Sequence, residues 1–114
     1  MKTVVSVITH VRKDDSFLFR KKPDGSLPYT ETWYAFGAVL DGEHTDADRE
    51  IGAAVKQKTG VTVSVSEHLW WDTEVKQDLD GEVKFFVYLH TIAHYTSGDL
   101  VASEGIEKLE WIPI

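Results

Sequence analysis

The chain has 114 residues, a length typical of one domain, and we expect a single domain over residues 1–114. Its 12 basic and 19 acidic residues give a formal net charge of −7, which argues against the basic surface that nucleic-acid binding needs. No apolar run reaches the roughly 20 residues of a membrane span. The absence of cysteine excludes disulfides and zinc–thiolate sites, and with no recognisable signal peptide we expect a cytoplasmic protein.

Most of the chain has the composition of strands. Runs rich in β-branched and aromatic residues predict six extended segments, at residues 3–11, 16–20, 33–39, 61–76, 82–95 and 108–112. Two prolines and a Pro-Asp-Gly sequence predict a surface loop at residues 21–32. The pair Asp80-Gly81 is typical of a type I′ turn, so the two longest segments are expected to form an antiparallel hairpin.

The hairpin segments carry large side chains on both of their faces. Neighbouring strand residues point in opposite directions, so Trp70 and Trp71 are expected on opposite sides of the sheet. The segment 82–95 is apolar on both sides, which predicts a sheet that is sandwiched or lies at an interface. His90 and His94 are about 13 Å apart along a strand, too far to share a metal ion.

One segment, residues 46–59, has the pattern of a helix. Asp46 is a suitable N-cap and Gly60 a suitable stop. An apolar stripe at helical spacing is formed by Ala47, Ile51, Ala54 and Val55. Gly52 lies in the middle, either as a tolerated weakness or as a point where another backbone approaches closely. The resulting order, β-β-β-α-β-β-β, predicts an α+β domain.

The segment GAVLDGEHTDADREIGAAVKQKTGV resembles the Nudix box, G-x5-E-x7-R-E-U-x-E-E-x-G-U, where U is apolar. Gly37 and Glu43 match the opening of that pattern, and Thr59, Gly60 and Val61 match its end. The resemblance implies an α/β/α sandwich around a mixed sheet, here with one main helix and no C-terminal helix. It also implies a hydrolase that cleaves nucleoside diphosphates linked to another group, with Mg²⁺ or Mn²⁺ as cofactor.

The chain departs from this pattern at the positions where the family binds its metal. Counting back from Gly60, the three metal-binding glutamates are replaced by Ala54, Gln57 and Lys58, and an alternative register does not restore them. Alanine cannot coordinate a cation, an amide is a weaker ligand than a carboxylate, and an ammonium repels a cation. We therefore predict that hydrolysis is impaired or lost. The Lys58 ammonium either takes the place of the cation, holding a phosphate or a carboxylate, or complements the helix C-terminus.

Two further sets of residues are candidates for binding. Glu43, Asp46 and Glu50 precede or begin the helix and could form a shifted metal site, although acids there are also ordinary caps and dipole partners. The candidates for contacts to the phosphate and the base of a substrate are Arg20, Trp33 and Phe86.

Three functions follow from these observations. The first is a Nudix-like protein that binds a nucleotide-like ligand without hydrolysing it. The second is an active Mg²⁺- or Mn²⁺-dependent hydrolase that uses the shifted carboxylates. The third is an interaction module, in which a second copy covers sheet surface that lacks a C-terminal helix and forms a homodimer.

Overall fold

The protein is represented by a computed structural model that describes residues 1–21, 33–103, 106 and 108–113. Its elements are, in chain order, β1 (Thr3–Lys13), β2 (Ser16–Lys21), β3 (Trp33–Tyr34), β4 (Phe36–Leu40), α1 (Ala47–Thr59), β5 (Thr62–Gln77), β6 (Val83–Ser97) and β7 (Lys108–Pro113). The predicted loop at residues 21–32 lies outside the described residues except for Lys21. The molecule measures 40 × 32 × 26 Å.

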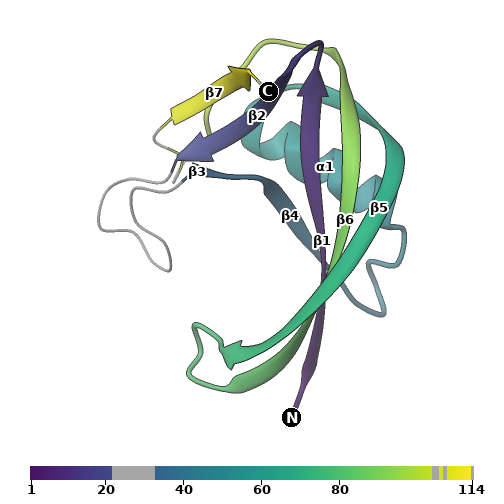
Figure 1. Cartoon of the computed structure of the whole chain (residues 1–114), viewed down its shortest axis with the longest axis vertical. Coiled ribbons are helices and arrows are strands. Elements are labelled where there is room, and N and C mark those ends of the chain that lie inside the picture. Colours follow the sequence, from purple (N-terminus) through teal and green to yellow (C-terminus); the bar gives the residue numbers. More distant parts are fainter. Residues whose placement is uncertain (22–32, 104–105, 107, 114) are drawn as a thin grey trace.

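The strands form one mixed sheet with the path β3-β2-β1-β6-β5, to which β4 is added beside β1 and β7 beside β2 (Figure 1). The β1 and β6 strands run parallel along almost their whole length, whereas the other pairs are antiparallel. The second edge of β1 is shared, because Lys13 pairs with Ser16 of β2 while Val5 pairs with Leu40 of β4. The sheet therefore divides at β1, and β2 and β4 diverge from it (Figure 1).

The structure confirms the predicted hairpin of β5 and β6 but corrects its turn. A type I′ turn requires a positive φ at both central residues, and only Gly81 has one, at 87°. The Gly81 amide donates to the Asp78 carbonyl (2.9 Å), and the Asp78 amide donates to the Glu82 carbonyl (2.8 Å). The loop is thus the three-residue kind that ends in a left-handed glycine. The predicted segment 33–39 is also divided, at Ala35, into β3 and β4.

The predicted helix is confirmed, with its caps. The Asp46 carboxylate accepts a hydrogen bond from the Arg49 amide (3.2 Å), and Gly60 ends the helix at φ 81°, where its amide donates to the Lys56 carbonyl (3.0 Å). The buried residues of α1 are Ile51, Val55 and Thr59. A Cβ at Gly52 would meet nothing within 4 Å among the described residues, so none of these approaches it closely and, for this part of the chain, that alternative is wrong.

The helix covers one face of the sheet, which is where the core lies. Odd-numbered residues of β1 point toward α1, and Val7 and Val11 are fully buried there. The core cluster consists of Val7, Val11, Leu18, Phe36, Ile51, Val55 and Val61. We call this side the covered face and the opposite side, with the even-numbered residues of β1, the open face. Among the described residues, no helix is long and apolar enough to cross a membrane.

Candidate functional site

The residues that the Nudix resemblance singles out lie together in one hollow between α1 and β4. The helix contributes one stripe of side chains spaced three and four residues apart, which places them on one side of α1. The strand and the loop after it form the opposite wall, and the space holds about 380 Å³. The lining residues are Gly37, Ala38, Val39, Asp41, His44, Glu50, Ala53, Ala54, Gln57 and Lys58.

Lys58 spans this hollow from the helix to the strand. Its Nζ donates a hydrogen bond to the Gly37 carbonyl oxygen at 3.1 Å, and the contact is partly buried. The sequence predicted that this ammonium would hold a phosphate or a carboxylate, or complement the helix C-terminus. One partner of the ammonium is a carbonyl of β4, whose Gly37 lies opposite Ile8 on β1. A positive charge therefore occupies the helix–strand space.

A second polar group, the Asp41 carboxylate, lines the hollow. One Asp41 carboxylate oxygen accepts hydrogen bonds from the Glu43 amide (2.8 Å), the His44 amide (2.9 Å) and the His44 Nδ1 (2.9 Å). The bond from the Glu43 amide and the bond from His44 lower the pKa of Asp41. The same carboxylate raises the pKa of His44. The Asp41 carboxylate is thus hydrogen-bonded to neighbouring groups of its own loop.

The structure does not bring Glu43, Asp46 and Glu50 together. Asp46 caps the helix, Glu50 lines the hollow, and Glu43 is an exposed residue of the loop. Within the described ranges, no group of three or more His, Asp or Glu side chains is placed to hold one metal ion. At the family's ligand positions the hollow presents a methyl group, an amide and an ammonium, a donor set that does not suit Mg²⁺ or Mn²⁺.

The three substrate-binding candidates are also separated. Arg20 lies over the Phe36 ring, with its Cζ 5.8 Å from the ring centre, and its Nε donates to the Ala35 carbonyl at 3.3 Å. Phe36 pairs with Thr9 of β1, whereas Phe86 pairs with Val4. Five positions along a strand amount to roughly 16 Å. Trp33 pairs with Lys21 through its backbone, and its side chain is outside the described atoms.

The open face carries a cluster that the sequence did not predict. His10 Nε2 lies 3.4 Å from His90 Nδ1, and His90 Nε2 lies 3.1 Å from the Asp72 carboxylate. The Trp70 indole stacks on the His90 ring, with 4.5 Å between ring centres and 10° between planes. Burial, followed by the charge of His90, lowers the pKa of His10. The positions of the histidines in the sequence do not predict this cluster, because it forms only when the strands that carry them are neighbours in the sheet.

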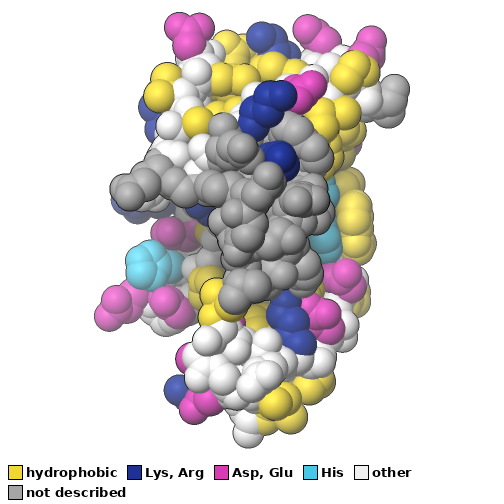
Figure 2. Space-filling view, turned by 90° about the vertical axis from the view of Figure 1, so that its left-hand side faces the viewer, with side chains coloured by type: hydrophobic (Ala, Val, Ile, Leu, Met, Phe, Trp, Pro, Cys, Tyr) yellow, Lys and Arg dark blue, Asp and Glu magenta, His cyan; other side chains and the backbone are white. Residues whose placement is uncertain are grey.

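The surface carries both acidic and basic side chains, as expected from the 19 acidic and 12 basic residues of the sequence. On the described part of the face in Figure 2, acidic side chains are spread from the upper to the lower end, and basic side chains occur in small separate groups. Apolar side chains gather at the upper end and at the lower end, where the β5–β6 hairpin lies.

Comparison with known proteins identifies the fold. No family model matches the sequence, and no curated protein matches it. The MutT protein of Methanosarcina mazei Go1 superposes with a TM-score of 0.76 at 16% identity, over 98% of this chain and 78% of that one. The MutT NUDIX hydrolase of Burkholderia pseudomallei gives 0.72 at 19% identity, over 99% and 84%. The NUDIX domain of Shewanella oneidensis NrtR, solved with ADP ribose, gives 0.66 at 15% identity, over 99% and 73%.

These structures share the arrangement found here, over nearly all of this chain, and they agree with the family that the segment from Gly37 to Val61 resembles. At such low identity the likeness concerns the path of the backbone and not the chemistry of the hollow. The chain therefore has the fold of the Nudix hydrolases.

Proposed function

We propose that this chain is a Nudix-fold protein that binds a nucleotide-like ligand and has lost metal-dependent hydrolysis of phosphoanhydrides. The observation that carries the proposal is the Lys58 ammonium, 3.1 Å from the Gly37 carbonyl in the hollow. Pyrophosphate cleavage by water needs divalent cations to neutralise the charge that develops on oxygen and to orient the water. A group of the same sign as the cation, in the same space, opposes that role.

The repulsion between the Lys58 ammonium and a metal cation in the hollow is large enough to prevent metal binding. Two unit charges of equal sign about 4 Å apart cost about 4 kcal/mol at an effective dielectric of 20. Since about 1.4 kcal/mol corresponds to a factor of ten, the penalty is about three decades in metal affinity. The methyl group of Ala54 and the amide of Gln57 supply no carboxylate to offset it. We infer that magnesium at ordinary millimolar concentration leaves the hollow without a catalytic ion.

Binding of a nucleotide-like ligand is supported by the open face. Trp70 is half exposed and presents a flat ring that already stacks on His90. Along the same face, Tyr88 stacks on Phe86, which is 7% exposed, with 6.0 Å between ring centres. Lys76 Nζ lies 4.8 Å from the centre of the Phe86 ring and 2.9 Å from the Glu74 carboxylate. Aromatic rings and a nearby cation are the groups that hold a base and a phosphate. The ADP ribose bound to the NrtR domain is such a ligand.

The competing function is an active hydrolase that uses shifted carboxylates, and Glu50 favours it because this acid lines the hollow. The test is a panel of nucleoside triphosphates, ADP-ribose and dinucleotide polyphosphates with Mg²⁺ or Mn²⁺, together with calorimetric titration of Mn²⁺. We expect no turnover above background and no heat of Mn²⁺ binding. Turnover that is lost in Glu50→Gln would establish the competing function instead.

A positive control tests whether the Mn²⁺ titration responds to the residues that coordinate the metal. The triple variant Ala54→Glu, Gln57→Glu and Lys58→Glu restores the family's three acids, and we expect it to bind Mn²⁺ where the natural chain does not.

A second experiment tests ligand binding, by titration of ADP-ribose into the natural chain without metal. Binding that weakens in Trp70→Ala supports the ligand-binding function, and no binding of any nucleotide in the panel contradicts it. A dimer in light scattering would favour the interaction module.

A further inference from the structure

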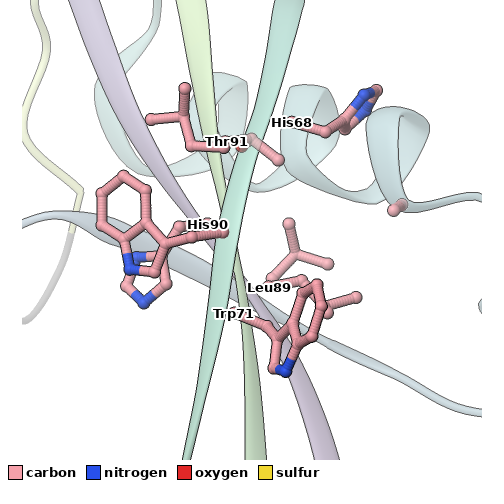
Figure 3. Close-up of a pocket in the computed structure, with 9 residues that line it drawn as sticks. His68, Trp71, Leu89, His90 and Thr91 are labelled. Atoms are coloured by element: carbon pink, nitrogen blue, oxygen red, sulfur yellow. The ribbon is translucent and has the colours of Figure 1, made fainter.

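A separate pocket opens on the covered face, at the other end of the helix from Lys58. It lies under the part of β5 where the pairing with β6 is irregular, between His68 and Trp70. The pocket holds about 280 Å³, and its wall is largely apolar. The residues that shape it on this side are Val7, Ala47, Leu69, Trp71, Leu89 and Thr91. Figure 3 shows Trp71 and Leu89 on one side of β5 and His90 on the other.

The pocket exists because three local features coincide. The irregular pairing adds Leu69 as an extra residue of β5, and such a bulge bends the strand locally. The first residue of α1, Ala47, contributes only a methyl group where a longer side chain would fill the space. The floor is rigid, because Val7 is fully buried and Thr91 is 2% exposed.

The mouth of the pocket is apolar and open to solvent. Trp71 is 73% exposed and Leu69 is 41% exposed. Large apolar side chains at such exposure favour binding when they gather around a concave site. The adjacent Trp70 and His90 also line the pocket, although their rings stack on each other on the open face.

Polar groups limit what the pocket can accept. At its rim, His68 Nε2 lies 2.9 Å from the Asp48 carboxylate, and both side chains are about half exposed or more. At its floor, the Thr91 hydroxyl donates to the Ile8 carbonyl at 3.4 Å, and this residue is only 2% exposed. The carboxylate at the rim attracts a hydrogen-bond donor and repels an anion.

We propose that this pocket binds a small, flat, apolar molecule of one or two fused rings that carries a hydrogen-bond donor and no negative charge. The ring fills the space between Val7, Ala47 and Leu89 and stacks against Trp71. The volume lies at the lower end of the range for small-molecule sites, which limits the ligand to this size. The site is distinct from the hollow at Lys58 and does not depend on the function proposed for that hollow.

The test uses 2-naphthol as the probe, followed by amide chemical-shift titration of the full chain. We expect one site with a Kd of about 0.1–1 mM, as the ligand's small size allows, and the largest shifts at Leu69, Trp71 and Leu89. Naphthalene-2-sulfonate has the same rings but an anion in place of the donor, and we expect it to bind at least about tenfold more weakly. Equal binding of the two probes would overturn the ligand class.

Matched variants locate the site. Ala47→Leu fills the pocket and Trp71→Ala removes its mouth, and each is expected to weaken 2-naphthol binding by about tenfold. Ala53→Leu fills the hollow instead, and Val75→Ala removes an exposed apolar side chain of β5 that does not line the pocket; both should keep the affinity within about twofold. Loss of binding in these controls, or no binding to the natural chain, would overturn the proposal. Trp71 is exposed, so its variant serves even if Ala47→Leu folds poorly.

Discussion

The two faces of the sheet differ in what stabilises them. On the covered face, Val7 and Val11 are fully buried beneath Ile51 and Val55 of α1, and the contacts are apolar. On the open face, contacts between rings and polar atoms join β1 to the β5–β6 hairpin, where His10 Nε2 lies 3.4 Å from His90 Nδ1, and also join the two strands of the hairpin, where Trp70 stacks on His90. In the described part of the chain one helix covers one face, and on the other face Trp70 is 50% exposed while Phe86 is only 7% exposed.

The covered face therefore contributes most of the folding stability, whereas the open face carries the groups that bind ligands and protons. Burial of apolar surface contributes free energy that does not depend directly on pH. Contacts between exposed rings and ionisable groups contribute less, and they respond to protons and ligands. We therefore expect substitutions on the covered face to change stability most, and substitutions on the open face to change binding and pH dependence.

The largest effect is expected for Ile51→Ala on the covered face. Ile51 is fully buried in the core cluster, and its truncation removes transfer free energy and leaves a cavity. We expect a loss of roughly 2–5 kcal/mol in the free energy of unfolding, measured by urea denaturation. Ile51→Val should lose only about 0.5–1.5 kcal/mol. A cost for Trp70→Ala on the open face equal to that of Ile51→Ala would contradict the comparison.

A smaller loss is expected for Lys58→Met, at the edge of the covered face. This change removes the bond to the Gly37 carbonyl and keeps the length of the side chain. Because the contact is partly buried, we expect a loss of about 1 kcal/mol in the free energy of unfolding. Lys56 is a matched control, since its Nζ donates to the Gly60 carbonyl at 3.0 Å in an exposed position. Lys56→Met should cost less than about 0.5 kcal/mol, and equal losses would refute the role of burial.

The features that the sequence predicts best are those set by local spacing. The helix follows from its caps at Asp46 and Gly60 and from Ile51 and Val55 at helical spacing. The opposite directions of Trp70 and Trp71 follow from the period of a strand, and the register confirms them. Both rules act over a few residues, so one sequence is enough to apply them.

The features that the sequence does not predict depend on distant pairing. His10 and His90 are 80 residues apart, and they meet only because β1 lies parallel to β6. No local pattern indicates which strands are neighbours. In the same way, the position of Lys58 in the hollow was predictable by counting along the helix, but its partner was not. Gly37 lies over α1 only because β4 pairs with β1.

A modest gain in stability is expected for Gly52→Ala. The added Cβ would meet nothing within 4 Å, and Gly52 lies inside α1, so the change supplies helix propensity without a clash. We expect the free energy of unfolding to rise by about 0.5–1 kcal/mol, measured by thermal and urea denaturation. A loss of stability would mean that a neighbour approaches this side of the helix after all.

The smallest effect is expected on the open face and depends on pH. Burial, and then the charge of His90, lowers the pKa of His10 below 6.5 in the folded state. As the pH falls through about 6.5, the unfolded chain takes up a proton that folded His10 does not, so stability is complete above this pH and declines below it. In His10→Gln, the free energy of unfolding should therefore fall less between pH 7.5 and pH 5.5 than in the natural chain.

His44 provides the opposite sign within the same molecule. Its hydrogen bond to Asp41 raises its pKa above 6.5, so its contribution is present below that pH and is lost as the pH rises through the folded value. His44→Gln should therefore make the decline in stability below pH 6.5 steeper, whereas His10→Gln makes it shallower. Urea denaturation of both variants at several pH values measures this divergence. Parallel curves for the two variants would mean that the pKa values of His10 and His44 are not shifted in opposite directions, which would contradict the structure.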